Sequence, residues 1–325
     1  MIEMTGCILC IIDGMTDESS TIPHVLAPWH KGSFATTPTG FDPESMPCIL
    51  SLMGLGPEQI PKQGRGWLEA LGSGVAIHRE MLVLRVSWVK TDSDGKLAGV
   101  VAPPEQPDLP GYYSLGSYKG ILCLPGLAKT LSVVQTFAPH RHMGRALSEC
   151  MPRGLPVLPQ PFASQGIWMV TWGESTEITL PRLKHPAVAV CGIPLVRGIA
   201  HAMGMESVQD KGLTGEVNTN LAVKRELALR YANEGSFVLL HINGADEAAH
   251  RGDALQKAAF VQKAIEDCVL PLLQSKVQVM VTSDHGSSYL TGRHMANLQP
   301  FYTNFCCSKG EAIKAHLAVS MFGSS

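Results

Sequence analysis

Residues 237–253 read FVLLHINGADEAAHRGD, a short apolar run that leads directly into acidic and histidine side chains. The apolar part, 237–242, has the length and composition of a buried strand. In the polar part, Asp246 and His250 are four residues apart, so on a helix their side chains share one face. Such a pair is typical either of a local hydrogen bond or of half a metal site, and the stretch alone does not distinguish the two.

Regular elements of the same kind surround this stretch. Apolar runs typical of strands alternate with amphipathic runs typical of helices in the last third of the chain and recur near its start. Strands are expected at 6–12, 185–192, 237–242 and 277–282, and helices at 194–204, 220–234 and 254–273. Strands that alternate with helices form a mainly parallel sheet covered by helices on both faces. The sequence therefore predicts a three-layer α/β core.

The middle of the chain has a different composition. Residues 101–165 are rich in proline and glycine and contain few regular runs. Such a shift is typical of an inserted unit rather than of a continuing α/β pattern. We therefore expect a core formed by residues 1–75 and 166–325, with a smaller α+β cap domain inserted at 76–165.

Composition limits the class of partner. The chain has 325 residues, 45% of them hydrophobic, and a formal net charge of -2. No long basic run is present, so neither nucleic acid nor an anionic membrane is expected as a partner. No stretch approaches the roughly 20 apolar residues of a membrane span. The nine cysteines are an odd number without framework spacing, which favours a reducing cytoplasm.

Metal-binding side chains follow three of the expected strands. They are Asp13 after the first strand, Asp246 and His250 after the strand at 237–242, and Asp284 and His285 after the last, with His294 ten residues after Asp284. Each feature alone is common in turns and local polar contacts. Ligands of open α/β sheets bind beyond the carboxyl ends of the strands, so their coincidence favours one shared site. Carboxylate and imidazole together suit zinc or manganese-type cations, and two such ions favour phosphoryl transfer.

Several segments, in order, carry a resemblance to a known family. They are GRGWLEALGSGV (64–75), IPLVRGIAHAMGM (193–205), GLTGEVNTN (212–220), VLLHINGADEAAHRGD (238–253) and VTSDHGSSYLTGRH (281–294). With them the chain resembles the archaeal-type cofactor-independent phosphoglycerate mutases, within the alkaline phosphatase-like metalloenzyme superfamily. The resemblance implies an alkaline phosphatase-like core. It also implies conversion of 3-phosphoglycerate to 2-phosphoglycerate through a phosphoserine, without 2,3-bisphosphoglycerate.

The resemblance also implies a cofactor and its ligands. Two divalent ions, drawn from Mn²⁺, Zn²⁺, Mg²⁺ or Co²⁺, are expected. Asp246, His250 and His294 match the ligands of the first ion. The ligands of the second ion match the positions Asp13, Ser45, Asp284 and His285.

The nucleophile is expected to be Ser45. Its assignment rests on aligning SMPCILSLMGLGP (45–57) with the family pattern SDxAxLSLLGYDP, in which the first serine is the nucleophile. Ser45 also suits the start of the helix that follows, where backbone N–H groups favour a phosphate. Ser33 and Ser51 are nearby rivals that lack the family context.

The chain departs from the family in its substrate-binding positions. Where the family usually has DRRAGRI in its cap, this chain has DGKLAGVVAPPEQPD (94–108), and its cap is shorter. Asn243 replaces a lysine, and Met46 replaces the aspartate after the nucleophile. These departures motivate a second hypothesis, a metal-dependent phosphatase or phosphotransferase acting on another small phosphorylated or phosphonylated metabolite. A third, a non-catalytic binding descendant, is disfavoured because the expected ligands are all present.

Four residues are expected to bind the anionic substrate: Arg65, Arg85, Arg197 and His140. Arginine suits this task because its guanidinium contacts carboxylate or phosphate through two parallel hydrogen bonds. Arg141, His142 and Arg145 form either a further anion-binding cluster or a solvated basic loop. His241 is expected to pack or donate locally rather than to bind metal.

Overall fold

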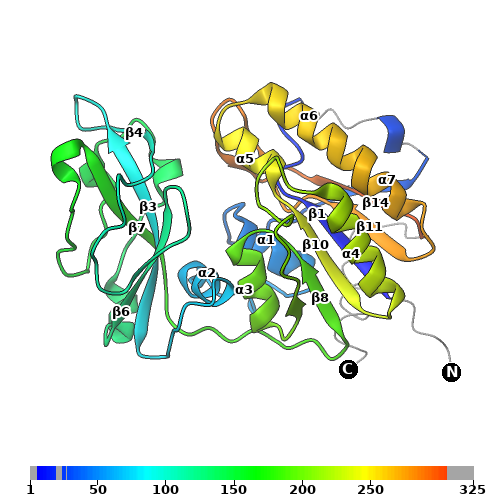
Figure 1. Ribbon diagram of the computed structural model, residues 1–325, viewed down its shortest axis with the longest axis horizontal. Helices are drawn as coiled ribbons and strands as arrows, with labels where there is room; N and C mark the ends of the chain where they lie inside the picture. Colours follow the sequence, from blue (N-terminus) through cyan, green and yellow to red (C-terminus); the bar gives the residue numbers. More distant parts are fainter. Residues whose placement is uncertain (1–5, 20–23, 27, 306–325) are drawn as a thin grey trace. The chain divides into compact units, whose positions relative to one another are not determined.

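The computed structural model of the chain describes residues 6–19, 24–26 and 28–305. Contacts divide the chain into two compact units. One unit comprises Met1–Ile60 and Leu180–Ser325, and the other comprises Pro61–Thr179. Each unit has its own sheet (Figure 1).

The first unit contains a seven-stranded, mainly parallel sheet in the order β2-β14-β11-β1-β10-β8-β9. The central strand β1 runs parallel to both of its neighbours, β10 and β11, and β8 and β9 continue the parallel part. The two strands β14 and β2 form an antiparallel edge beside β11. The bounds are β1 Cys7–Ile12, β2 His30–Phe34, β8 Ala187–Val190, β9 Glu206–Ser207, β10 Phe237–Ile242, β11 Gln278–Thr282 and β14 Gln299–Thr303.

Helices cover both faces of this sheet (Figure 1). Ile8, Cys10 and Ile12 pack in one apolar cluster with residues of α4, α6 and α7. Successive side chains of a strand point to opposite faces, so Leu9 and Ile11 face the other layer, which holds α1 and α3. The bounds are α1 Ser45–Leu52, α3 Pro194–Ala202, α4 Leu221–Asn233, α5 Gly244–His250, α6 Ala254–Ala264 and α7 Leu270–Leu273. The predicted three-layer α/β core is confirmed.

The helix expected at 254–273 contains an irregular segment. The α-helical hydrogen bonding of α6 ends at Ala264, a π-helical turn spans Ile265–Val269, and α7 follows. Pro271 lies in the first turn of α7, where its missing N–H removes one hydrogen bond of a continuous helix. The three helical segments follow one another without a break, so the sequence has a helical period throughout 254–273.

The second unit is built on an antiparallel sheet in the order β4-β3-β6-β5, with β7 also paired to β3. Its long strand β3 buries Leu82, Leu84, Val86 and Trp88 in one apolar cluster. The bounds are α2 Arg65–Gly72, β3 Met81–Thr91, β4 Leu97–Val100, β5 Tyr112–Ser114, β6 Lys119–Pro125 and β7 Ile167–Ser175. The Pro- and Gly-rich segments thus connect regular strands.

This unit is wider than the cap expected from composition at 76–165, because α2 and β7 belong to it. Helix α2 packs closely against β3 and β7. A Cβ atom at Gly66 would lie 2.6 Å from the carbonyl oxygen of Val83 and 2.9 Å from that of Gly173. A glycine at this position therefore permits the helix to approach the sheet.

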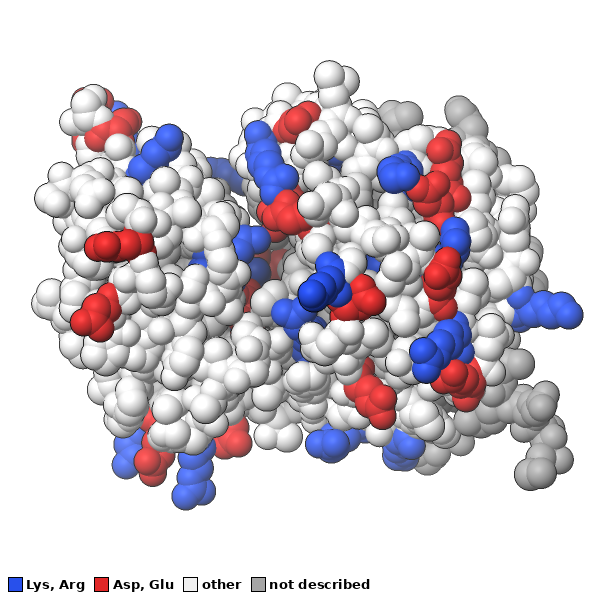
Figure 2. Space-filling model, in the orientation of Figure 1, with Lys and Arg blue, Asp and Glu red and all other residues white. Residues whose placement is uncertain are grey.

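Charged side chains of both signs are interspersed on the face shown in Figure 2, and no large area of one sign stands out there. Within the described part of the chain, no helix has both the length and the apolar character needed to cross a membrane.

Candidate metal centre

The site lies where three neighbouring parallel strands end. Asp13 follows β1 directly, Asp284 follows β11 by two residues, and α5 begins two residues after β10. Because β1 is parallel to both β10 and β11, the three carboxyl ends meet at one edge of the sheet. All the predicted metal ligands belong to this first unit.

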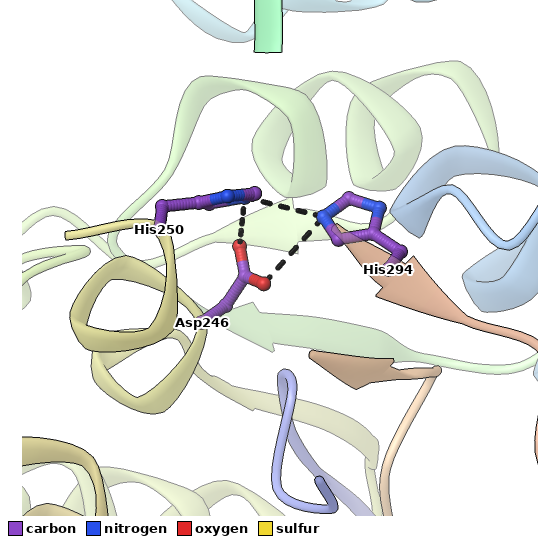
Figure 3. A group of neighbouring side chains, drawn as sticks. All are labelled: Asp246, His250 and His294. Atoms are coloured by element: carbon purple, nitrogen blue, oxygen red, sulfur yellow. Dashed lines mark hydrogen bonds and ion pairs between the residues drawn. The ribbon is translucent and has the colours of Figure 1, made fainter. Parts of the chain in front are cut away.

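The first ligand group consists of Asp246, His250 and His294 (Figure 3). His250 Nε2 lies 3.1 Å from Asp246 Oδ2, and His294 Nε2 lies 3.5 Å from Asp246 Oδ1. The two Nε2 atoms are 3.2 Å apart. Three ligand atoms therefore converge, as the sequence predicted for one ion.

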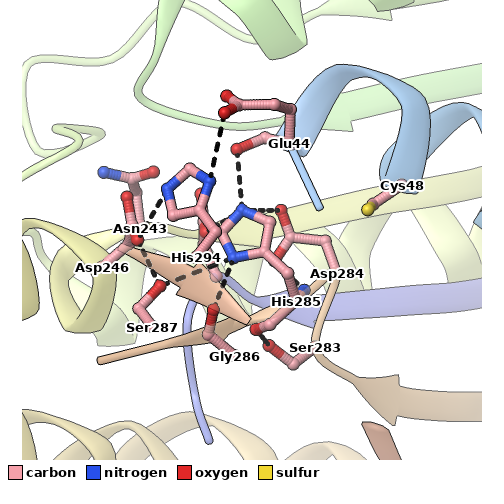
Figure 4. Close-up of polar contacts among 12 residues, drawn as sticks. Glu44, Cys48, Asn243, Asp246, Ser283, Asp284, His285, Gly286, Ser287 and His294 are labelled. Carbon is pink, nitrogen blue, oxygen red and sulfur yellow. Dashed lines mark hydrogen bonds and ion pairs between the residues drawn. The ribbon is translucent and has the colours of Figure 1, made fainter. Parts of the chain in front are cut away.

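The second ligand group surrounds His285. Its Nε2 lies 3.4 Å from Asp284 Oδ2 (Figure 4). The same atom lies 3.1 Å from Ser45 Oγ and 3.6 Å from Asp13 Oδ1. Ser45 is the first residue of α1, so this helix places its hydroxyl within the group. The rival Ser33 lies instead in β2, opposite Pro300. The geometry favours the expected nucleophile.

The two groups adjoin each other. Ligand atoms of Asp13, Asp246 and His285 all lie within 4.8 Å of one another, although Asp246 belongs to the first group. The rings of His285 and His294 are stacked with centroids 3.9 Å apart. Two ions held by these groups would be close neighbours, as in sites that clamp a transferring phosphoryl group.

Hydrogen bonds set the orientation of the imidazoles. His250 Nδ1 lies 2.8 Å from the carbonyl oxygen of Gly292, and His285 Nδ1 lies 3.3 Å from that of Gly286. A carbonyl accepts only, so each Nδ1 carries the proton and donates. The Nε2 atom of each ring therefore faces the site, and it can bind metal when it carries no proton.

The carboxylates are buried and repel one another. Burial and the charges of Asp284 and Asp246 raise the pKa of Asp13 well above its usual value. Burial and the charge of Asp246 raise the pKa of Asp284 to about 7. Burial alone would raise the pKa of Asp246, but His250 and His294 hold it well below its usual value. Ionising Asp13 and Asp284 together beside Asp246 is therefore unfavourable unless a cation is bound.

The pKa values of the three histidines differ because their neighbours differ. Burial alone would lower the pKa of His250, but the Asp246 carboxylate outweighs it and raises the pKa to about 9. Burial lowers the pKa of His285. Burial and His285 lower the pKa of His294 to about 4. His285 and His294 are thus neutral at pH 7, the form in which imidazole binds metal.

Two buried carboxylate oxygens of this site would be satisfied by a bound cation. Among the residues that the structure describes, Asp13 Oδ1 and Asp284 Oδ2 are buried oxygens without a hydrogen-bond partner. Such orphaned atoms are rare and costly in a folded protein. The oxygen and nitrogen donors of both groups match divalent ions of the zinc and manganese type. The residues present therefore fit the metals that the resemblance implied.

Comparisons with known proteins agree with this geometry. The family model of 2,3-bisphosphoglycerate-independent phosphoglycerate mutase matches residues 30–102. A mutase of that name from Methanothrix thermoacetophila is 27% identical over 83% of this chain and 79% of its own length. Another from Methanocaldococcus jannaschii is 22% identical over 94% and 92%, respectively. Over most of its length this chain is similar to the cofactor-independent phosphoglycerate mutases.

Solved structures show the same fold. A cofactor-independent phosphoglycerate mutase from Thermoplasma acidophilum has a TM-score of 0.51 and 18% identity to this chain. The match covers 97% of this chain and 100% of the Thermoplasma chain. A protein from Pyrococcus horikoshii matches 93% and 88%, with a TM-score of 0.66 and 19% identity. The resemblance that the motifs predicted is confirmed.

Two further residues support the ligands of this chain. Ser287 Oγ donates to Asp246 Oδ1 at 2.5 Å. The buried Lys257 donates from Nζ to the carbonyl oxygens of Thr16 and Ser287, which connects the loop after β1 to the loop after β11. Sequence reasoning missed both Ser287 and Lys257. The position of Ser287, two residues after the DH pair, was the available signal, whereas nothing in the helical pattern of α6 marked Lys257.

His241 lies beneath the second ligand group. Its side chain is fully buried, and its Nε2 is 3.4 Å from Asp13 Oδ2. Burial and the charge of Lys224 lower its pKa to about 3, so the ring is neutral. Lys224 Nζ donates to the carbonyl oxygen of His241 at 2.5 Å. The sequence predicted a local packing role for His241, and its place next to Asp13 is one that only the fold reveals.

The expected substrate residues fall in both units. In the second unit, the guanidinium of Arg65 lies 4.8 Å from the Trp172 ring, that of Arg85 lies 5.9 Å from it, and the His140 ring lies 5.4 Å away. Buried Glu69 pairs with Arg65 at 2.9 Å and also with Arg85. Arg197 is part of the first unit, where its Nη1 donates to the carbonyl oxygen of Gly192 at 3.4 Å.

The neighbouring basic loop is more solvated. The Arg145 side chain is 59% exposed, and its Nη1 lies 3.7 Å from Oε2 of Glu149, which is 54% exposed. His142 Nδ1 lies 3.0 Å from the carbonyl oxygen of Ala138. Both contacts favour the solvated-loop interpretation for these two side chains.

Proposed function

We propose that this protein is a metal-dependent phosphoglycerate mutase. It converts 3-phosphoglycerate to 2-phosphoglycerate through a phosphoserine at Ser45. The observation that carries the proposal is the Ser45 hydroxyl, 3.1 Å from His285 within the second ligand group, in a chain related to such mutases. The partner is then a small phosphorylated metabolite.

The cofactor we propose is two divalent ions from the set Mn²⁺, Zn²⁺, Mg²⁺ and Co²⁺. Asp246, His250 and His294 would hold the first, and the second would be held by Asp13, Ser45, Asp284 and His285. When bound, such ions lower the pKa of a coordinated hydroxyl and neutralise charge on a transferring phosphoryl group.

The proposed reaction begins with the attack of Ser45 Oγ on the phosphorus atom of 3-phosphoglycerate. The bond between phosphorus and the C3 oxygen breaks, and the proton lost by the serine hydroxyl is delivered to that oxygen. Phosphoserine and glycerate result. After glycerate reorients, its C2 hydroxyl attacks the phosphoserine, loses its proton, and leaves Ser45 free as a hydroxyl again.

The N-terminus of α1 suits the phosphoryl group during both steps. Ser45 and Met46 occupy its first turn, where backbone N–H groups have no partner within the helix. Such groups and the helix dipole favour an anion. The position of Ser45 and the dipole of α1 therefore both favour the transferred phosphoryl group at this place.

We further propose that Arg65, Arg85, His140 and Arg197 bind the anionic groups of the substrate. The contact of both guanidinium groups with the Trp172 ring holds them in place. Arg65→Ala is expected to raise KM for 3-phosphoglycerate about 10-fold, since one charged contact contributes about 1.5 kcal/mol or more. A KM that stays within twofold of the wild type would remove Arg65 from the substrate site.

One observation favours the alternative of a phosphatase or phosphotransferase acting on another metabolite. Buried Glu69 pairs with both Arg65 and Arg85, and this pairing neutralises part of their charge. Such a cluster would hold a dephosphorylated intermediate more weakly than two unpaired arginines. Water, rather than a retained glycerate, would then accept the phosphoryl group.

One assay separates the two functions. Purified protein is supplied with 3-phosphoglycerate and Mn²⁺, and both 2-phosphoglycerate and free phosphate are measured. The mutase proposal expects 2-phosphoglycerate without added bisphosphoglycerate and little phosphate. Phosphate without the isomer would favour the phosphatase, and neither product would refute both for this substrate.

We also place the reaction in the cytoplasm. The described cysteines are free thiols, among them Cys10, Cys48 and Cys191, each buried. Such thiols persist most readily in a reducing compartment.

A further inference from the structure

We infer that Glu44 is a positioning residue for the metal centre. Its carboxylate lies 3.8 Å from His294 Nδ1, where its negative charge favours a proton on that nitrogen and leaves the Nε2 lone pair for the first ion. This inference rests on the proposed function, because it concerns the metals that the function requires.

The geometry of His294 carries the inference (Figure 4). Its Nε2 faces the first ligand group, 3.2 Å from His250 Nε2 and 3.5 Å from Asp246 Oδ1. Its other ring nitrogen, Nδ1, lies 3.8 Å from Glu44 Oε1. Both side chains are largely buried, with 7% of His294 and 19% of Glu44 exposed. At this distance the contact between the carboxylate and the neutral ring is electrostatic rather than a hydrogen bond.

In each of the three histidine ligands, Nδ1 faces an oxygen atom. His250 and His285 each direct Nδ1 to a backbone carbonyl oxygen, from Gly292 and Gly286 respectively. His294 directs Nδ1 to a side-chain carboxylate instead. The negative charge of that carboxylate favours the proton on the nearer ring nitrogen, Nδ1, and so makes Nε2 the better ligand atom. The ligand contributed by the last loop of the site therefore depends on Glu44.

Glu44 is itself held by its backbone. Its N–H donates to the carbonyl oxygen of Asp42 at 2.8 Å, and its own carbonyl accepts from Cys48 N–H at 3.1 Å, which begins α1. A negative charge at this end of a helix is favourable. The stacked ring of His285 limits the other side of His294.

Glu44 and Ser45 are neighbours in the sequence, which links the two ligand groups. Glu44 directly precedes the nucleophile Ser45, so one short segment contacts the first ligand group and supplies a side chain to the second. A shift of the α1 N-terminus would alter both. Glu44 thus couples the position of His294 to that of Ser45.

The test uses Glu44→Gln and Glu44→Ala in the full chain, with Glu58→Ala as the control. Glu58 is exposed, belongs to the same unit and lies outside the site. ¹⁵N-histidine NMR of the metal-free protein reports the tautomer of His294, and calorimetric titration with Mn²⁺ reports affinity. Circular dichroism checks that each variant is folded.

We expect the Nδ1–H tautomer of His294 in the wild type and in Glu58→Ala. Glu44→Ala is expected to lose that preference and to bind Mn²⁺ about 10- to 100-fold more weakly, the usual effect of removing such a partner. The isosteric Glu44→Gln retains an acceptor oxygen and is expected to lose less. An unchanged tautomer in Glu44→Ala, or Mn²⁺ affinity within twofold of the wild type, would overturn the inference.

The same data distinguish this inference from the proposed function. A wild-type protein that binds no Mn²⁺ at millimolar concentration would refute the metal centre, and the inference with it. A wild type that binds Mn²⁺ while the Glu44 variants bind it equally well would refute only the role of Glu44.

Discussion

Replacing Asp284 by asparagine is expected to stabilise the metal-free protein while abolishing metal-dependent stabilisation. Asp284 is fully buried, and burial together with the charge of Asp246 raises its pKa from 3.8 to about 7. At 1.36 kcal/mol for each pH unit, ionising this carboxyl in the folded protein costs about 4 kcal/mol. Asparagine has nearly the same shape and no charge, so the cost disappears.

The dependence on pH has a definite sign. The folded pKa lies above the unfolded value, so the folded protein binds more protons between pH 3.8 and about 7. The stability of the metal-free wild type therefore falls as pH rises through that window, and the full cost is present above pH 7. The metal-free Asp284→Asn variant is expected to lack this part of the fall.

Urea unfolding in EDTA at pH 5 and pH 8, with and without Mn²⁺, measures the effect. At pH 8 in EDTA, Asp284→Asn is expected to be more stable than the wild type by about 2–4 kcal/mol. Saturating Mn²⁺ should stabilise the wild type by about 2.7 kcal/mol at 100 times Kd, and the variant much less. The exposed Asp94, 71% accessible, provides the control Asp94→Asn, with an expected change within about 0.5 kcal/mol.

Two results would refute this reasoning. A metal-free Asp284→Asn protein no more stable than the wild type at pH 8 would show that the buried carboxylates do not strain the folded state. Equal stabilisation of variant and wild type by Mn²⁺ would show that Asp284 is not a ligand.

Three further predictions concern the nucleophile, a supporting lysine and the core. Ser45→Ala is expected to lower the rate of phosphoryl transfer by at least about 10³-fold with an unchanged circular dichroism spectrum, and full activity would show that the nucleophile was misassigned. Lys257→Met removes the ammonium that donates to two loop carbonyls, of which that of Thr16 keeps the Ser287 N–H as a donor, and is expected to cost about 1–3 kcal/mol in urea unfolding, with weaker Mn²⁺ binding; unchanged stability and Mn²⁺ affinity would remove Lys257 from the support of the site. Leu240→Ala, in the fully buried core of β10, is expected to cost about 2–5 kcal/mol, whereas Leu255→Ala, 85% exposed, should stay within about 0.5 kcal/mol; similar losses for both would contradict the burial assignment.

Local patterns predicted most of the core. The run 237–242 coincides with β10, and the helices expected at 194–204 and 220–234 correspond to α3 and α4 within two residues at each end. Buried parallel strands are continuous apolar runs and surface helices have a 3.6-residue period, so each is visible in the sequence. The antiparallel strands β2 and β14 were not predicted, because they are short and mixed in composition.

The second unit was harder to predict. Its sheet depends on antiparallel pairing between segments as distant as β3 and β7, whose partners include Trp88 and Met169. Proline- and glycine-rich connections hide such pairing, since register is set by contacts far apart along the chain. Composition could therefore mark an insertion but not the pairing of its strands or its width.

The sequence by itself determined which residue types the metal centre has and the order in which they occur. DxxxH at 246–250, DH at 284–285 and a later histidine are local features, and their chemistry follows from residue type. Only the tertiary structure decided what orients them: a carboxylate at Glu44, a hydroxyl at Ser287, a buried ammonium at Lys257. These contacts join residues between 30 and 250 positions apart, a placement that depends on the parallel order of β10, β1 and β11.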